Sequence, residues 1–300
     1  MRCAITRPPG ASAAPAARRY DYFRPTTLDE AFELKRRIDG ARFVAGGTDV
    51  MVRIKGRVEQ PAALISLRGI EALRGVELGA GGTRVGAATT IAELLDHAEL
   101  CERYPGLSQA ARLIGSAQIR SVATLGGNLG NASPCADTAP PLLTMEARLE
   151  LVGPDGSREV GIEELFVGPG QTCLASEELI AALLLPPPNP DARELFQKKR
   201  RVAMDLALAS VAIRIELDGA RCRGARIAAG SVAPTPVRLK AAETALEGEE
   251  LSDDTIAAAR LAAVEAIAPI DDIRASADYR RQIVGVYVQR GIKRLMTEDG

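Results

Sequence analysis

The spacing of apolar and polar positions predicts a helix followed by strands at the start of the chain. Thr27 and Glu30 form a capping box ahead of an amphipathic segment that ends near Gly40, which predicts a helix. The apolar runs 41–45 and 62–67 are short enough to be buried strands. The first of these runs leads directly into a glycine turn, so we expect a helix–strand–turn unit here.

The pattern next predicts a strand–helix unit and a hairpin. A strand through Val85 leads to a second capping box, formed by Thr90 and Glu93. Residues 148–161 place apolar positions on both sides of a Pro-Asp-Gly turn, which is typical of a β-hairpin.

A proline-rich segment, 186–190, predicts a boundary because proline cannot continue a helix or a central strand. Beyond it, apolar positions alternate from 211 to 217, and a second strand is expected at 222–232. Two helices follow, and Ser276 is placed to cap the last one. The pattern therefore predicts an α+β protein with a larger N-terminal and a smaller C-terminal part.

Composition and charge exclude several classes of function. The 300 residues include 38 basic and 39 acidic side chains, and a net charge of −1 gives no long-range attraction to nucleic acid or to anionic membranes. No apolar run is long enough for a membrane span. Residues 1–18 have no signal-peptide core, so we expect a disordered extension there.

Cysteine and histidine usage argues against a metal centre on this chain. The five cysteines are scattered without a C-x-x-C pair, and there is one histidine. Zinc and iron–sulfur sites need clustered ligands, so no metal site is expected. Scattered cysteines are typical of reduced thiols, which favours a cytoplasmic protein.

Two glycine segments with polar neighbours carry the candidate chemistry, "AGGTD" at 45–49 and "TLGGN" at 124–128. Each follows an apolar, strand-like segment and is expected to be a turn. Successive backbone N–H groups in such a turn bind anions such as phosphate. Gly-Gly alone is usually an ordinary turn, but two turns could hold both halves of a pyrophosphate. The standard nucleotide-binding signatures are absent. The residues thus predict an extended phosphorylated ligand, for which a dinucleotide is one candidate.

Four longer segments reveal a resemblance to a known family. They are "FVAGGTDVMVRIK", "IGSAQIRSVATLGGNLGNASPCADTAPPLL", "FVGPGQTCL" and "ASADYRRQIVGVYVQRGI". Together they resemble the FAD-binding medium subunit of the molybdenum hydroxylases, the xanthine dehydrogenase and carbon monoxide dehydrogenase family, from about residue 19 to 296. "NASPCADTAPP" and "FVGPG" resemble the xanthine dehydrogenase branch more.

The resemblance implies a fold and a division into domains. An FAD-binding domain of the vanillyl-alcohol-oxidase type is expected at 19–190, built from two α/β subdomains at about 19–75 and 76–190. A C-terminal α+β domain with a small antiparallel sheet and helices is expected at 191–300.

The resemblance also implies which residues bind FAD. The expected set is Val44, Ala45, Gly46, Gly47, Thr48, Asp49, Val50, Ile114, Thr124, Leu125, Gly126, Gly127, Asn128, Asp137, Ile180 and Lys198. The two glycine segments would hold the pyrophosphate, Asp137 would contact FAD, and Lys198 would lie near the flavin ring. A one-residue shift would put Lys199 there instead, and both Asp137 as a turn cap and Lys198 as a solvated surface residue are structural alternatives.

The function implied by the resemblance is electron transfer. A large subunit would carry the molybdenum cofactor, a small subunit two [2Fe–2S] clusters, and this chain the FAD that passes electrons to NAD⁺ or another acceptor. The complex is expected to be a dimer of heterotrimers, with no catalytic residue on this chain. A self-contained flavin oxidase of the same fold and a non-redox nucleotide-binding module are the alternatives.

Overall fold

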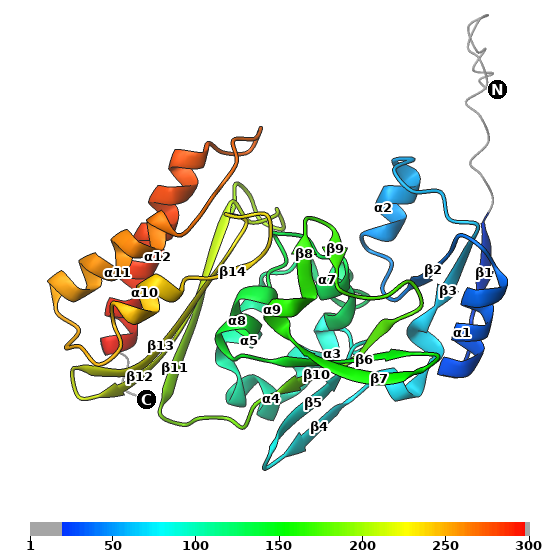
Figure 1. Cartoon of the computed structure of the whole chain (residues 1–300), viewed down its shortest axis with the longest axis horizontal. Coiled ribbons are helices and arrows are strands. Elements are labelled where there is room, and N and C mark those ends of the chain that lie inside the picture. The colour runs from blue at the N-terminus through cyan, green and yellow to red at the C-terminus, as the bar shows by residue number, and fades with distance from the viewer. Residues whose placement is uncertain (1–19, 298–300) are drawn as a thin grey trace, which may run out of the picture.

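The computed structural model describes residues 20–297, and three main sheets organise them (Figure 1). The predicted disordered extension at 1–18 lies outside the described residues. None of the described helices is both long and apolar enough to cross a membrane. The mixture of sheets and helices confirms the expected α+β class.

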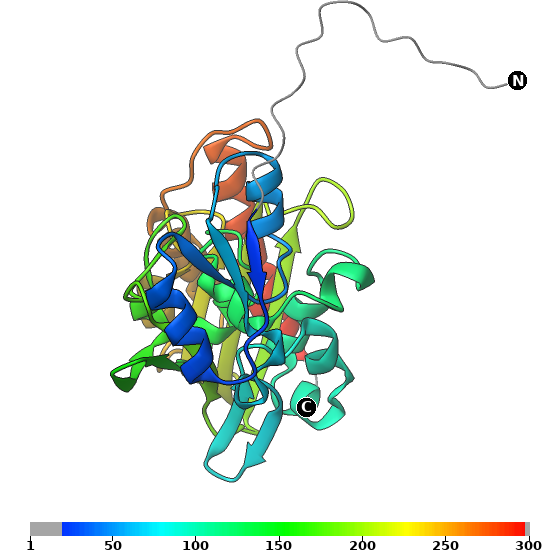
Figure 2. The ribbon, with the colours of Figure 1, turned by 90° about the vertical axis from the view of Figure 1, so that its right-hand side faces the viewer.

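The first sheet is small and parallel, with the strand order β1-β3-β2. Its elements are β1 (Asp21–Phe23), α1 (Leu28–Arg37), β2 (Ala41–Val44), α2 (Val50–Lys55) and β3 (Ala63–Ser66). The capping box of Thr27 and Glu30 forms as predicted, and α1 buries Phe32 against the sheet. Figure 2, seen from the side of this sheet, shows α1 beside its strands.

The second sheet has five antiparallel strands in the order β4-β5-β10-β6-β7. Its strands are β4 (Val76–Gly79), β5 (Gly82–Gly86), β6 (Arg148–Gly153), β7 (Gly156–Gly161) and β10 (Leu179–Leu185), and the short strands β8 (Phe166–Gly168) and β9 (Gln171–Thr172) pair with each other nearby. The β6–β7 hairpin and the capping box of Thr90 and Glu93 are confirmed.

Short helices connect or follow the strands of this sheet. They are η1 (Leu67–Gly69), η2 (Glu71–Leu73), α3 (Ile91–Asp96), α4 (Ala98–Arg103), α5 (Pro105–Arg112), α6 (Ala117–Arg120), α7 (Leu125–Gly130), α8 (Ala139–Thr144) and α9 (Ile162–Leu165). Among them, α3, α4, α5, α7, α8 and α9 contribute buried side chains to the largest apolar core. Leu125 and Leu129, both on α7, are fully buried in that core.

The third sheet is antiparallel, in the order β11-β12-β13-β14, and carries three helices on one face (Figure 1). The elements are β11 (Ala192–Lys199), β12 (Ala209–Asp218), β13 (Arg221–Gly230), β14 (Val237–Arg238), α10 (Lys240–Thr244), α11 (Asp253–Glu265) and α12 (Ala277–Thr297). The predicted strand pair is confirmed, and Ser276 caps α12 by accepting a hydrogen bond from the Tyr279 N–H at 3.2 Å. A short third helix, α10, was not expected.

Polar contacts join the third sheet to the rest of the molecule. Gln109 on α5 accepts a hydrogen bond from the Phe196 N–H of the edge strand β11 at 2.8 Å. Arg238 in β14 donates to the Leu143 carbonyl of α8, at 3.3 Å. The Ser231 N–H donates to the Pro134 carbonyl at 2.7 Å. The first contact ties β11 to α5, and the other two tie the β13–β14 part of the third sheet to α8 and the residues before it.

Candidate functional site

A cavity of about 420 Å³ lies where the three sheets approach one another. The predicted residues that line it are Val44, Ala45, Gly46, Gly47, Thr48, Asp49, Val50, Ile114, Thr124, Gly126, Gly127, Asn128, Asp137, Ile180 and Lys198. Leu125 is the exception, because its side chain points into the core of the second sheet. The fold therefore gathers segments that are more than 150 residues apart in the chain.

The first glycine segment is an open loop between β2 and α2. Among the described residues, the backbone N–H groups of Gly46, Gly47, Thr48 and Asp49 donate to no acceptor. Gly47 has a φ of +74°, a conformation that glycine adopts without strain. A row of open N–H groups beside a cavity is suited to an anionic ligand.

The second glycine segment is not the turn that was expected. It follows the helix α6 instead of a strand, and it forms the first turn of α7, with Thr124 as the N-cap. The Gly127 N–H donates to the Thr124 hydroxyl at 3.0 Å, and the Gly126 N–H donates to the Ala87 carbonyl at 2.9 Å. The expectation of a second open row is wrong because these donors already have partners within the chain.

The glycines are required first of all by backbone packing. A Cβ on Gly46 would overlap the Val122 carbonyl and lie 2.8 Å from the Ala123 Cα. A Cβ on Gly126 would lie 2.5 Å from the Ala87 Cβ. The two segments can thus approach their neighbours only without a side chain. The small number of large side chains in 123–137 reflects close backbone packing as well as access to the cavity.

A buried ion pair lines the cavity. Lys198 Nζ lies 2.6 Å from Asp137 Oδ2, and the two side chains are 2% and 8% exposed. Burial raises the pKa of Asp137 to about 6, because desolvation of the carboxylate outweighs its attraction to Lys198. The other carboxylate oxygen, Oδ1, has no partner among the described residues. Lys198 lines the cavity and Lys199 does not, which favours the first of the two alternatives for the lysine.

A group of apolar residues from one cluster also lines the cavity and was not found from the sequence. Its members are Phe43, Leu67, Leu73 and Leu179. Beside them, Glu178 is held by two hydrogen bonds from Arg158, each 2.8 Å long. These bonds lower the pKa of Glu178 to about 2, so an ionised acceptor faces the cavity. No spacing rule indicates such a set, because its members come from separate elements.

Two further segments at the cavity were also missed. Met204, Asp205 and Leu206 line the cavity from the loop 200–208, which joins β11 to β12. Cys135 lines it as well, and Arg274 Nη1 lies 3.9 Å from its sulfur. Within residues 20–297, no three side chains of the His, Cys, Asp or Glu type converge as a metal site would need.

Two family models together match most of the chain. The model described as "FAD binding domain in molybdopterin dehydrogenase" matches residues 18–188. The model described as "CO dehydrogenase flavoprotein C-terminal domain" matches residues 194–295.

Individual proteins show the same relationship over almost the whole length. A putative xanthine dehydrogenase FAD-binding subunit of Escherichia coli is 32% identical, covering 93% of this chain and 97% of that protein. The carbon monoxide dehydrogenase medium chain of Afipia carboxidovorans is 31% identical, covering 92% and 96%. The nearly equal identities leave the expected preference for the xanthine dehydrogenase branch a prediction.

Solved structures agree with this relationship. Carbon monoxide dehydrogenase from Hydrogenophaga pseudoflava, in a form lacking the Mo-pyranopterin moiety, matches with a TM-score of 0.90 and 31% identity, covering 92% of this chain and 97% of that one. The chain therefore belongs to the family of FAD-binding medium subunits of molybdenum hydroxylases, oxidoreductases of the xanthine dehydrogenase and carbon monoxide dehydrogenase type.

Proposed function

We propose that this chain holds one non-covalently bound FAD in the cavity and transfers electrons within a heterotrimeric molybdenum hydroxylase. The row of open N–H groups at 46–49 carries the proposal, because it offers an anion site in a cavity that is also lined by apolar residues and by a buried ion pair. Bound FAD would supply the redox chemistry, and the chain would bind and orient it.

The donor set of the cavity fits each part of FAD. The open N–H groups and the Thr48 hydroxyl would bind the pyrophosphate. The apolar residues Phe43, Leu67, Leu73 and Leu179 would contact the adenine, with the Glu178 carboxylate as an acceptor for hydroxyl or amino groups. The flavin ring would lie beside Asp137 and Lys198, where Oδ1 of Asp137, which has no partner among the described residues, offers a further acceptor.

We place the domain boundaries as the resemblance implies. The FAD-binding domain would span 19–190, with subdomains at about 19–75 and 76–190, and the C-terminal domain would span 191–300. The sheets support this division, since β3 ends at Ser66 before β4 begins at Val76, and β10 ends at Leu185 before β11 begins at Ala192.

Partner subunits would carry the metal centres. Relatives named as medium chains of carbon monoxide dehydrogenase imply larger and smaller companions. We assign the molybdenum cofactor to the large subunit and two [2Fe–2S] clusters to the small one, with NAD⁺ or another acceptor taking the electrons. The expected assembly is a dimer of heterotrimers in the cytoplasm, which the free thiols of the four described cysteines support.

Absorption and co-purification test the proposal. The purified chain should absorb at about 450 nm, as flavin does in general, and acid precipitation should release the colour into the supernatant. Co-expression with the two partner subunits should give a complex that reduces its flavin when substrate is added. A chain that takes up no FAD would refute the proposal. Oxidation of an organic substrate by the chain alone would favour a self-contained oxidase.

A further inference from the structure

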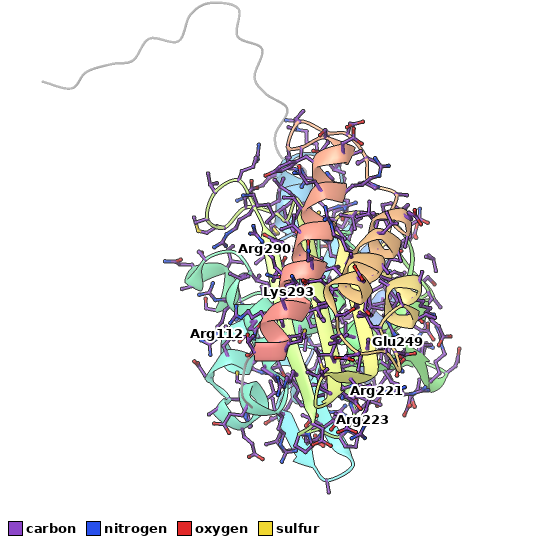
Figure 3. The ribbon with its side chains drawn as sticks, turned by 90° about the vertical axis from the view of Figure 1, so that its left-hand side faces the viewer. Arg112, Arg221, Arg223, Glu249, Arg290 and Lys293 are labelled. Carbon is purple, nitrogen blue, oxygen red and sulfur yellow. The ribbon has the colours of Figure 1, made fainter. Side chains whose placement is uncertain are left out.

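The edge strand β11 has different neighbours on its two faces. Its odd-numbered side chains face α12, because a Cβ on Gly291 would lie 3.1 Å from Gln197 Oε1 and 3.4 Å from Leu195 Cδ2. Figure 3 shows α12 from outside, with Arg112, the last residue of α5, to one side of it. Since side chains alternate along a strand, the even-numbered residues of β11 face the other way and lie along α5.

Two hydrogen bonds fix β11 along α5. In the first turn of the helix, the Gly106 N–H donates to Glu194 Oε2 at 3.0 Å. Three residues further on, Gln109 Oε1 accepts a hydrogen bond from the Phe196 N–H at 2.8 Å, and Phe196 packs against Ala110 of the same helix. Because β11 is an edge strand, this N–H points away from β12, and Gln109 takes the place of a neighbouring strand.

The cavity lysine leaves β11 on this same face, two residues after Phe196. Lys198 Nζ donates to Asp137 Oδ2 at 2.6 Å and to the Leu113 carbonyl, which follows α5, at 3.4 Å. Asp137 does not belong to the third sheet, because it lies between α7 and α8. The distance between the ammonium group and the carboxylate therefore depends on how β11 lies against α5.

We propose that Gln109 is a positioning residue that holds Lys198 in place against Asp137, an inference that rests on the proposed function. Gln109 is not one of the described residues that line the cavity, so it acts through β11. Pairing with β12 fixes β11 within the third sheet, and the contacts of Ser231 and Arg238 hold the β13–β14 part of that sheet. Gln109 holds β11 itself, and with it the charge that would lie beside the flavin ring.

The pKa of Asp137 reports where Lys198 lies. Burial raises this pKa to about 6, and the positive charges of Lys198 and Arg200 oppose the rise. A weaker contact with Lys198 would therefore raise the pKa further. The other described titratable residues at the cavity are Arg42, Asp49, Cys135, Glu178 and Asp205 in its lining, and Arg274 in contact with Cys135. They are left unchanged in the test, so they produce no difference between its variants.

The test uses four variants of the full chain. Gln109→Met keeps the length of the side chain and removes the acceptor of the Phe196 N–H. Ser108→Ala is the matched control, because Ser108 is the neighbour of Gln109 on α5 and its hydroxyl donates within the helix, to the Pro105 carbonyl at 3.1 Å. Lys198→Met removes the ammonium group itself, and the fourth variant combines it with Gln109→Met. The double variant shows whether Gln109 acts through Lys198.

The first measurement is the stability of the flavin-free protein from about pH 4 to about pH 8. In Gln109→Met the folded state should hold the Asp137 proton more tightly, so the fall in stability with rising pH should extend higher than in the wild type by about 0.5–1 pH unit. Lys198→Met should extend the fall further, and adding Gln109→Met should then change nothing. Ser108→Ala should follow the wild type.

The second measurement is the dissociation constant for FAD, from titration of the same proteins. It should be higher in Gln109→Met than in the wild type by about threefold to tenfold, the range expected for the loss of one hydrogen bond. In the Lys198→Met background, Gln109→Met should again have no effect. A merely structural contact would instead weaken FAD binding equally in both backgrounds.

An unchanged pH dependence or an unchanged FAD affinity in Gln109→Met would overturn the proposal. So would an effect of the same size with and without Lys198, or in Ser108→Ala. A wild type that takes up no FAD would refute the proposed function, whereas the pH dependence without flavin would still decide whether Gln109 positions Lys198. Flavin binding by the wild type with no difference in Gln109→Met would refute the positioning role alone.

Discussion

The two glycine segments look alike in the sequence and differ in the structure. Gly46 and Gly47 belong to an open loop that lines the cavity, and their N–H groups have no partner among the described residues. Gly126 and Gly127 belong to the first turn of α7, where the N–H groups bond to Ala87 and Thr124. The first segment therefore has free N–H donors for a ligand, whereas the second is tightly packed and lines the cavity with its donors already bonded.

The difference shows what a glycine pair does and does not indicate. In both segments a glycine is needed where one backbone lies against another, at Gly46 and at Gly126. Whether the N–H groups have partners depends instead on whether the glycines themselves form the first turn of a helix. Glycine content thus predicts close approach of the backbone, and the free donors must be established separately.

The largest effects on stability should come from substitutions that add a side chain where these glycines lie against neighbouring backbone. Gly46→Ala and Gly126→Ala each place a Cβ against neighbouring protein atoms, so each should lower the free energy of unfolding by about 3 kcal/mol. Gly81→Ala is the control, because open space surrounds that position. Urea denaturation of the three variants measures the effect. If Gly46→Ala were as stable as Gly81→Ala, the packing explanation would fail for the loop.

A somewhat smaller effect, a dependence of stability on pH, should distinguish Asp137, which follows the second segment, from Asp49 in the first. The folded pKa of Asp137 is about 6, above its usual 3.8, so the folded state binds this proton more tightly than the unfolded state. The contribution of Asp137 to stability is therefore greatest below pH 4 and falls by about 2–3 kcal/mol as the pH rises to about 6. Asp137→Asn should abolish this fall in the flavin-free protein.

Asp49→Asn is the matched control for this pH dependence. Asp49 lies in the open loop, lines the same cavity and is exposed to solvent. Chemical denaturation between pH 4 and pH 7 should give parallel curves for this variant and the wild type. An Asp137→Asn curve that also ran parallel to the wild type would contradict the raised pKa.

The smallest effects should come from the two threonines. Thr124→Val removes the N-cap of α7 and should lower the free energy of unfolding by about 1 kcal/mol. The Thr48 side chain has no hydrogen bond among the described residues, so Thr48→Val should leave stability unchanged and weaken FAD binding by up to about tenfold. Thermal unfolding and FAD titration separate the two. If Thr48→Val lowered the free energy of unfolding as much as Thr124→Val does, the Thr48 side chain in the open loop would also stabilise the fold.

Much of the fold follows from local signals. The capping boxes at Thr27 and Thr90, the β6–β7 hairpin and the strand pair after the proline segment all form as predicted. Each depends on interactions between residues close in sequence, so the spacing is sufficient to predict it. The helix α7 was missed because a glycine-rich segment has low helix propensity, and its N-cap and packing compensate for this.

The candidate site was predicted largely through the resemblance, and its arrangement was not. The sequence by itself determined the α+β class, most of the helices and strands, and the two glycine segments, because propensity, capping and alternation act over a few residues. Only the tertiary structure brought Lys198 to Asp137, directed Leu125 away from the cavity, and placed Glu178 in its lining. These positions depend on how the three sheets pack, and packing between segments far apart in the chain leaves no periodic signal in the sequence.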